Sequence, residues 1–224
     1  MTTARPPARL APRVVPSVDP WVAGEMFVSP HIEERRRGFA ILFGTEAVRR
    51  STLTSQLLAS RVDEPDLGLR AQIVQALADY FEVRGADYRY PAEVRAVAAG
   101  HLRRFERAEI LAMLELHQAA REGTVRLAPD SLNRLLSRIP SASSHLVRMA
   151  TDRLLAVRVR RAAEELIGRV GFTDAVQALE GLEARLAGRR AGQIAMAFAP
   201  AEHADEQTLL PVLQTALEAL REDE

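Results

Sequence analysis

Lysine and cysteine are both missing from this sequence. All 30 basic residues are arginines, and the cysteine count is 0. Without cysteine the chain has no disulfides, no thiol nucleophiles and no thiolate ligands for a metal ion. Without lysine it cannot form a Schiff base or supply the lysine of a phosphate-binding loop. Codon bias in a GC-rich genome and selection against modification of the ε-amine both explain the missing lysine, and both stay open.

The chain also has no net charge and no long apolar run. The 30 arginines are balanced by 30 Asp and Glu, so the formal net charge is +0. This balance argues against binding nucleic acid by bulk charge. No segment approaches the ~18 apolar residues of a membrane span, and the first residues lack the apolar stretch of a signal peptide. We therefore expect a cytoplasmic protein without a membrane partner, whose apolar content of 47% suffices for a hydrophobic core.

The patterns that carry catalysis or hold a cofactor are absent as well. Of the five histidines, no two stand three or four residues apart, so no helix face offers a pair of imidazole ligands. No glycine-rich phosphate loop and no Gly-x-Ser-x-Gly motif occur. We expect no catalytic residues, no metal site and no cofactor, and therefore a protein that is not an enzyme.

The first 28 residues differ in composition from the rest. Five of the 12 prolines lie within the first 20 residues, interleaved with arginines. Because proline fixes φ and removes an amide donor, residues 1–28 are predicted to form an extended arm. Two roles stay open for this arm: a loose tail, or a segment that docks on a partner or on the body of the chain. The single Trp, Trp21, is predicted to anchor the arm and is a candidate partner-binding residue.

From residue 29 to residue 224, apolar residues recur with the period of a helix. Ser29 and Pro30 combine an N-cap with a proline at the first helical position. A typical apolar stripe runs through Leu69, Ile73 and Leu77. No run of four or more residues alternates as a strand does. The sequence predicts an all-α fold of about ten helices with essentially no sheet. A helical bundle and a stack of helix pairs both fit this pattern.

Four segments of this region are similar to one another. They span 67–81, 92–105, 144–157 and 157–171, with Arg70, Arg95, Arg148 and Arg160 near their starts. Asp66 stands four residues before Arg70. The pattern resembles the HEAT repeat, in which an Asp in a turn and an Arg early in the second helix recur, and it matches best at 46–82 and 143–186. The resemblance implies an α-α superhelix of stacked pairs over 29–224, in which Asp66 caps a helix and Arg70 reaches the neighbouring pair.

HEAT-like and armadillo-like proteins mostly act as binding surfaces. The resemblance therefore implies a non-catalytic adaptor or scaffold for a protein partner. Two alternatives come from other members of this class: a nucleic-acid-binding or DNA-repair protein similar to the alkylpurine glycosylases, and a lyase or chaperone for a tetrapyrrole. The zero net charge and the single Trp count against nucleic acid, because an enzyme that handles an exposed base needs aromatic side chains to stack on it.

Clustered arginines are the most prominent polar feature of the chain. Consecutive arginines on a helix point about 100° apart, so part of each cluster faces solvent. The guanidinium group pairs bidentately with carboxylates, which predicts an acidic protein segment as the partner. Solubility and salt bridges between repeats are the alternative use for these arginines. The candidate partner-binding residues are Arg35, Arg36, Arg37, Arg103 and Arg104, together with Trp21.

Overall fold

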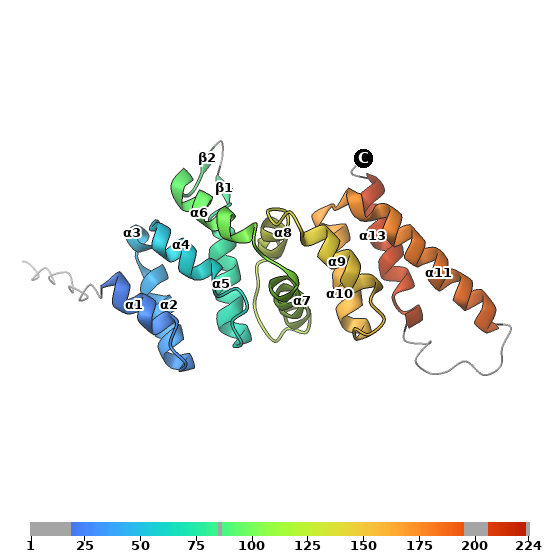
Figure 1. The fold of residues 1–224 in the computed structure, drawn as a ribbon, viewed down its shortest axis with the longest axis horizontal. Coiled ribbons are helices and arrows are strands. Elements are labelled where there is room, and N and C mark those ends of the chain that lie inside the picture. Colours follow the sequence, from blue (N-terminus) through green and yellow to red (C-terminus); the bar gives the residue numbers. More distant parts are fainter. Residues whose placement is uncertain (1–18, 85–86, 195–205, 223–224) are drawn as a thin grey trace, which may run out of the picture.

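The computed structural model describes residues 19–84, 87–194 and 206–222, and this part of the chain is almost wholly helical. The helices stand side by side in one elongated row, with the N-terminal helices at one end and the C-terminal helices at the other (Figure 1). The predicted all-α fold is confirmed. Residues 1–18, which make up most of the predicted arm, lie outside the described residues.

The helices are short to medium in length and follow one another closely. Their bounds are α1 Pro20–Phe27, α2 Ile32–Gly44, α3 Glu46–Arg49, α4 Thr52–Ala59, α5 Leu67–Asp79, α6 Ala92–Leu102, α7 Arg107–Arg121, α8 Ser131–Leu136, α9 Ala142–Thr151, α10 Val157–Val170, η1 Thr173–Ala175, α11 Val176–Ile194 and α13 Leu210–Glu222. None of the helices within the described ranges is long and apolar enough to cross a membrane.

Two layers of helices run along the row. In one layer α2, α5, α7, α10 and α13 contact each other in succession, and in the other α4 packs on α6 and α9 on α11. The apolar stripes face the space between these layers, and Leu69, Ile73 and Leu77 are all fully or almost fully buried. A helix pair that contacts only its neighbours along the row is the arrangement of an α-solenoid. We call the layer of α2, α5, α7, α10 and α13 the second-helix layer.

The last residues of the predicted arm are helical rather than extended. Residues 20–27 form α1, which starts with the Asp19 carboxylate accepting from the Trp21 amide at 3.0 Å and with proline at the first helical position. Ala23 and Phe27 are fully buried against α2. The approach is close: a Cβ on Gly38 would lie 2.5 Å from the Phe27 nitrogen. The helical body therefore includes residues that the sequence analysis assigned to the arm.

A small hairpin is the one pair of strands in the described residues. Strands β1 (Val83–Arg84) and β2 (Asp87–Tyr88) pair antiparallel over two residues each, between α5 and α6. This ribbon is too short to build a core of its own. The expectation of essentially no sheet therefore holds for the part of the chain described.

Three buried arginines tie successive helix pairs together. Arg35, Arg70 and Arg160 each occupy the fourth position of a helix, in α2, α5 and α10, and each is less than 9% exposed. Each guanidinium donates to a backbone carbonyl just before its own helix or in the helix that precedes it. These acceptors are the carbonyls of Ser29 and Pro30 for Arg35, Glu64 for Arg70 and Ala150 for Arg160.

The same three arginines then reach forward to the next pair. Arg35 Nη2 lies 2.7 Å from Glu64 Oε1, at the entrance to α5. Arg70 Nη1 donates to the Ala112 carbonyl at 3.1 Å and to Glu115 Oε2 at 2.8 Å, both on α7. Arg160 Nη1 lies 2.6 Å from Glu206 Oε1, ahead of α13. We call this repeated contact the arginine ladder. Charge-assisted hydrogen bonds of this kind fix the spacing of neighbouring pairs.

The contacts expected of Asp66 and Arg70 are confirmed. Asp66 caps α5, since its carboxylate accepts from the Leu69 amide at 2.8 Å, and it also pairs with Arg36 at 3.1 Å. Arg70 bridges two helix pairs as described above. Of the other arginines in the predicted pattern, Arg95 is half-buried, donates to the nearby Tyr90 carbonyl at 3.2 Å and lies over the Tyr88 ring, and Arg148 is exposed.

The middle of the row is irregular. The short helix α8 packs against both α5 and α10, so it fills the space beside α7. At the fourth position of α7 stands Ile110, which is fully buried and carries no charge. Among the described contacts, the step from α7 to α10 therefore has no ladder arginine. Polar contacts of a different kind join α7 and α10, and these contacts border the candidate site.

Candidate functional site

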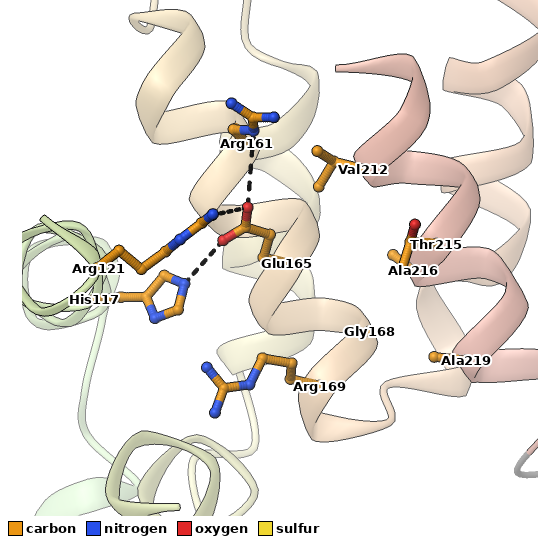
Figure 2. Close-up of a pocket in the computed structure, with 10 residues that line it drawn as sticks. All are labelled: His117, Arg121, Arg161, Glu165, Gly168, Arg169, Val212, Thr215, Ala216 and Ala219. Carbon is orange, nitrogen blue, oxygen red and sulfur yellow. Dashed lines mark hydrogen bonds and ion pairs between the residues drawn. The ribbon is translucent and has the colours of Figure 1, made fainter. Parts of the chain in front are cut away.

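A groove lies where α7, α10 and α13 meet in the second-helix layer (Figure 2). Its volume is about 500 Å³. One side is formed by α7 and α10 and the other by α13. The lining residues are His117, Arg121, Arg161, Glu165, Gly168, Arg169, Val212, Thr215, Ala216 and Ala219. We call this space the α7–α13 groove.

Small residues make the floor of the groove. Gly168 on α10 faces Ala216 on α13 so closely that a Cβ on Gly168 would lie 2.8 Å from the Ala216 Cα. Real Cβ atoms are not found so close to a backbone carbon, so the crossing of these two helices depends on glycine. Ala219 and Val212 continue the α13 side without filling the space above it. The result is an apolar surface that a partner side chain can reach.

Charged side chains form the opposite wall, around the Glu165 carboxylate. His117 Nε2 lies 3.1 Å from Glu165 Oε2, and Arg121 forms an ion pair with Oε1. Arg161, one helical turn before Glu165, lies 3.8 Å from the same carboxylate (Figure 2). His117 is almost fully buried, whereas Arg121 and Arg161 are about half exposed. The His117 and Arg121 contacts join α7 to α10 at the step without a ladder arginine.

The surroundings keep Glu165 ionised. Burial raises the pKa of this carboxyl, but hydrogen bonds from His117 and Arg121 and the positive charge of Arg121 outweigh burial and lower it below its ordinary value. Arg169, at the far end of the groove, is exposed and donates to the Pro129 carbonyl at 3.0 Å, and its other N–H groups have no acceptor among the described residues.

The charged wall continues beyond the groove. A smaller hollow of about 280 Å³ shares Arg121, Arg161 and Glu165 with the α7–α13 groove and adds Arg158 and Glu122. The two hollows together present four arginines and two glutamates along α7 and α10. This surface has an apolar floor and a rim on which arginines outnumber carboxylates.

The candidate residues from the sequence do not gather at this groove. Arg35 is buried in the arginine ladder, which corrects the expectation that all three arginines of 35–37 face a partner. Arg36 is exposed and pairs with Glu33 and Asp66, and Arg37 is exposed. No hydrogen bond or ion pair among the described residues joins any two of the six candidates.

The remaining candidates lie at two other places on the surface. Arg103 and Arg104 are exposed at the end of α6, and Arg104 borders a small hollow of about 180 Å³ beside Asp63 and His101. Trp21 is 68% exposed on α1, so it is not buried as an anchor between the arm and the helical body.

Sequence reasoning gave no reason to single out the groove residues as a set. His117 and Glu165 are 48 residues apart and meet only because α7 packs on α10. The one local feature of the sequence that falls at the groove is the arginine pair Arg160–Arg161. Arg160 is buried, and Arg161 is exposed. Arg161 and Glu165 are spaced i, i+4, so one helix face carries both.

No family model matches the chain, and neither the curated proteins nor the solved structures gave a match. The resemblance to HEAT repeats therefore remains a prediction from the sequence pattern, while the stacked helix pairs are observed.

The close crossing at the groove floor gives a direct prediction. We expect Gly168→Ala to lower the free energy of unfolding by about 1–3 kcal/mol, because the added methyl group meets the α13 backbone and forces α10 and α13 apart. Gly181→Ala on α11 is the matched control, since its Cβ would meet nothing within 4 Å. That variant should gain about 0.5–1 kcal/mol from helix propensity. Urea unfolding of both variants measures the difference, and equal behaviour would contradict the packing described.

Proposed function

We propose that this protein is a non-catalytic adaptor or scaffold, and that its α7–α13 groove binds an acidic segment of a partner protein. The observation that carries the proposal is the groove itself: an apolar floor bordered by arginines, in the second-helix layer of a helical stack. Stacked helix pairs offer an extended surface of this kind to peptides.

The chemistry of the groove supports binding rather than reaction. Its one carboxylate, the half-buried Glu165, is already held by His117 and Arg121, and Thr215, its one hydroxyl, donates to the Pro211 carbonyl at 3.0 Å. The hydroxyl donates to a backbone carbonyl rather than to a base, and the carboxylate is held by cationic side chains, so neither group is set up as a nucleophile. Arg161 and Arg169 have exposed donors that suit carboxylates, and the floor suits an apolar anchor such as Leu or Phe.

The test uses labelled short peptides in which Glu and Asp flank one or two Leu or Phe residues. Fluorescence polarisation against the full chain should detect binding, and peptides with Arg in place of the acids should not bind. The double variant Arg161→Glu/Arg169→Glu should weaken binding about tenfold or more, because two charge-assisted contacts become repulsive.

The matched control is Arg103→Glu/Arg104→Glu, which changes the net charge by the same amount on a different part of the surface. It should bind the peptides as the unmodified protein does. If this control loses binding and the groove variant does not, the partner site lies at the end of α6 and the groove assignment is wrong. Circular dichroism confirms that both variants remain helical.

A further inference from the structure

A smaller hollow of about 280 Å³ adjoins the α7–α13 groove. The last turn of α7 lines it with Gln118 and Arg121, and the N-terminal part of α10 lines it with Arg158, Arg161 and Glu165. We call this space the α7–α10 hollow. Arg121, Arg161 and Glu165 also line the groove, so one bound segment can reach both spaces.

Three arginines border the α7–α10 hollow with unused donors. Arg121 and Arg161 approach Glu165 from different helices (Figure 2). Arg121 uses only Nη1 for its ion pair with Glu165, and Arg161 brings only Nε to the carboxylate, at 3.8 Å. Arg158 is exposed and forms no hydrogen bond or ion pair with any described residue. Each of the three guanidinium groups therefore keeps N–H groups that an anion in the hollow can meet.

Two further side chains of the lining act in opposite directions on an anion. Gln118 Nε2 is buried and has no hydrogen-bond acceptor among the described residues, so an oxygen atom in the hollow would give it one once the amide turns toward it. Glu122 is exposed and forms no ion pair within the described ranges, so its charge opposes an anion. The lining therefore favours a ligand whose charge is large enough to outweigh that repulsion.

We propose that the acidic segment bound by the groove carries a phosphorylated side chain, and that its phosphate group binds in the α7–α10 hollow. The inference rests on the proposed function of the groove. A carboxylate presents two coplanar oxygens, which a single guanidinium fork can satisfy. A phosphate monoester presents three oxygens in a tetrahedral arrangement and about −1.5 to −2 charges. Three arginines that reach one hollow from two helices suit the phosphate better, and Glu165 holds Arg121 and Arg161 in place before the ligand arrives.

The test compares matched peptides by fluorescence polarisation against the full chain, at constant ionic strength. Each pair contains a Leu or Phe anchor, flanking acids and one serine that is either free or phosphorylated, and the series varies the spacing between the anchor and the serine. Phosphorylation should tighten binding about tenfold or more at the spacing that fits, since charge-assisted hydrogen bonds are gained. A glutamate in place of the phosphoserine should recover only part of this gain, because it has fewer oxygens and less charge.

Arg158→Gln separates the two spaces, because Arg158 lines the hollow but not the groove. This variant should weaken phosphopeptide binding about fivefold or more and leave binding of the unphosphorylated form unchanged. Glu122→Gln should tighten phosphopeptide binding, because a repulsive charge is lost. The matched control is Arg169→Gln, which replaces an exposed arginine of the same helix that lines only the groove. It should weaken both forms by the same factor.

The outcomes distinguish this inference from the proposed function. Unphosphorylated peptides that bind while phosphorylation adds nothing would overturn the phosphate site and leave the groove assignment standing. A gain that survives in Arg158→Gln, or that Arg169→Gln removes to the same extent, would also overturn the phosphate site. Binding of the phosphorylated form alone, lost in Arg158→Gln, would support the phosphate site and count against the groove. If neither form binds, both proposals are wrong.

Discussion

Glu64→Gln is expected to lower the free energy of unfolding by about 3–5 kcal/mol, because it leaves the buried guanidinium of Arg35 without its counter-charge. Glu64 is completely buried, and its carboxylate accepts from Arg35, from Arg61 at 2.7 Å and from the Asp66 amide at 3.2 Å. Arg35 contributes three of these hydrogen bonds, with the shortest at 2.7 Å. No other carboxylate in the described contacts reaches Arg35.

The measurement is urea unfolding at neutral pH, with Glu33→Gln as the control. Glu33 is largely exposed and pairs with Arg36 within one helix turn, so its loss should change stability by less than about 0.5 kcal/mol. Equal small losses in the two variants would show that the arginine ladder does not hold the pairs together.

The effect of Glu64→Gln should also depend on pH. Burial raises the pKa of Glu64, but hydrogen bonds from Arg35, the Asp66 amide and Arg61, together with the Arg35 charge, lower it below its ordinary value. A carboxyl whose pKa is lowered by folding stabilises the folded state at every pH above its ordinary pKa. This stabilisation is lost as the pH falls through the folded-state pKa. The difference between Glu64→Gln and the unmodified chain should therefore shrink in acid.

Glu164→Gln, in contrast to Glu64→Gln, is expected to raise the free energy of unfolding at neutral and alkaline pH. Glu164 is fully buried in α10, and neither of its carboxyl oxygens has a hydrogen-bond partner. Burial raises its pKa to about 8, with repulsion from Glu165 added and partial relief from Arg160 and Arg161. The folded protein therefore keeps a proton on Glu164 that the unfolded chain releases.

A raised carboxyl pKa costs stability progressively as the pH rises from the ordinary value, 4.5, to the folded-state value of about 8. The amide of the variant does not titrate. At about pH 8 the free energy of unfolding of Glu164→Gln should therefore exceed that of the unmodified chain by of the order of 2–4 kcal/mol. Near pH 4 the gain should vanish, because the carboxyl is then protonated in both states. Urea midpoints across this range measure the trend. A gain that does not change with pH would contradict a buried, protonated Glu164.

The sequence predicted the helices and the core well because both depend on local pattern. The stripe of Leu69, Ile73 and Leu77 is buried as expected, and the Asp66 cap and the Arg70 bridge follow from their positions beside α5. The rule that a capping residue followed by proline starts a helix holds at the start of α1. Asp19 and Pro20 form such an N-cap and first-position pair, but the density of prolines before them favoured an extended arm. The pair predicted at Ser29 and Pro30 is wrong, because α2 begins at Ile32 with His31 as its N-cap.

The partner-binding residues were harder to predict because they depend on which helices meet. Arg35, Arg36 and Arg37 are adjacent in the sequence, and their adjacency favoured a common role. Their positions in the helix separate them: Arg35 belongs with Arg70 and Arg160 at the fourth position and faces inward. The contact between His117 and Glu165 exists only after α7 packs on α10, so no local spacing could have indicated it.

The uneven spacing of the arginine ladder has a mechanical consequence. Wherever a buried arginine bridges two pairs, bending the row breaks desolvated charge contacts, so those joints should be stiff. Between α7 and α10 no buried arginine forms a bridge among the described residues: Glu165 pairs there with the buried His117 and with the partly exposed Arg121, and water can replace the Arg121 contact at lower cost. The row should therefore behave as two rigid arms joined by a compliant joint, and any molecule seated in the α7–α13 groove would set the angle between them.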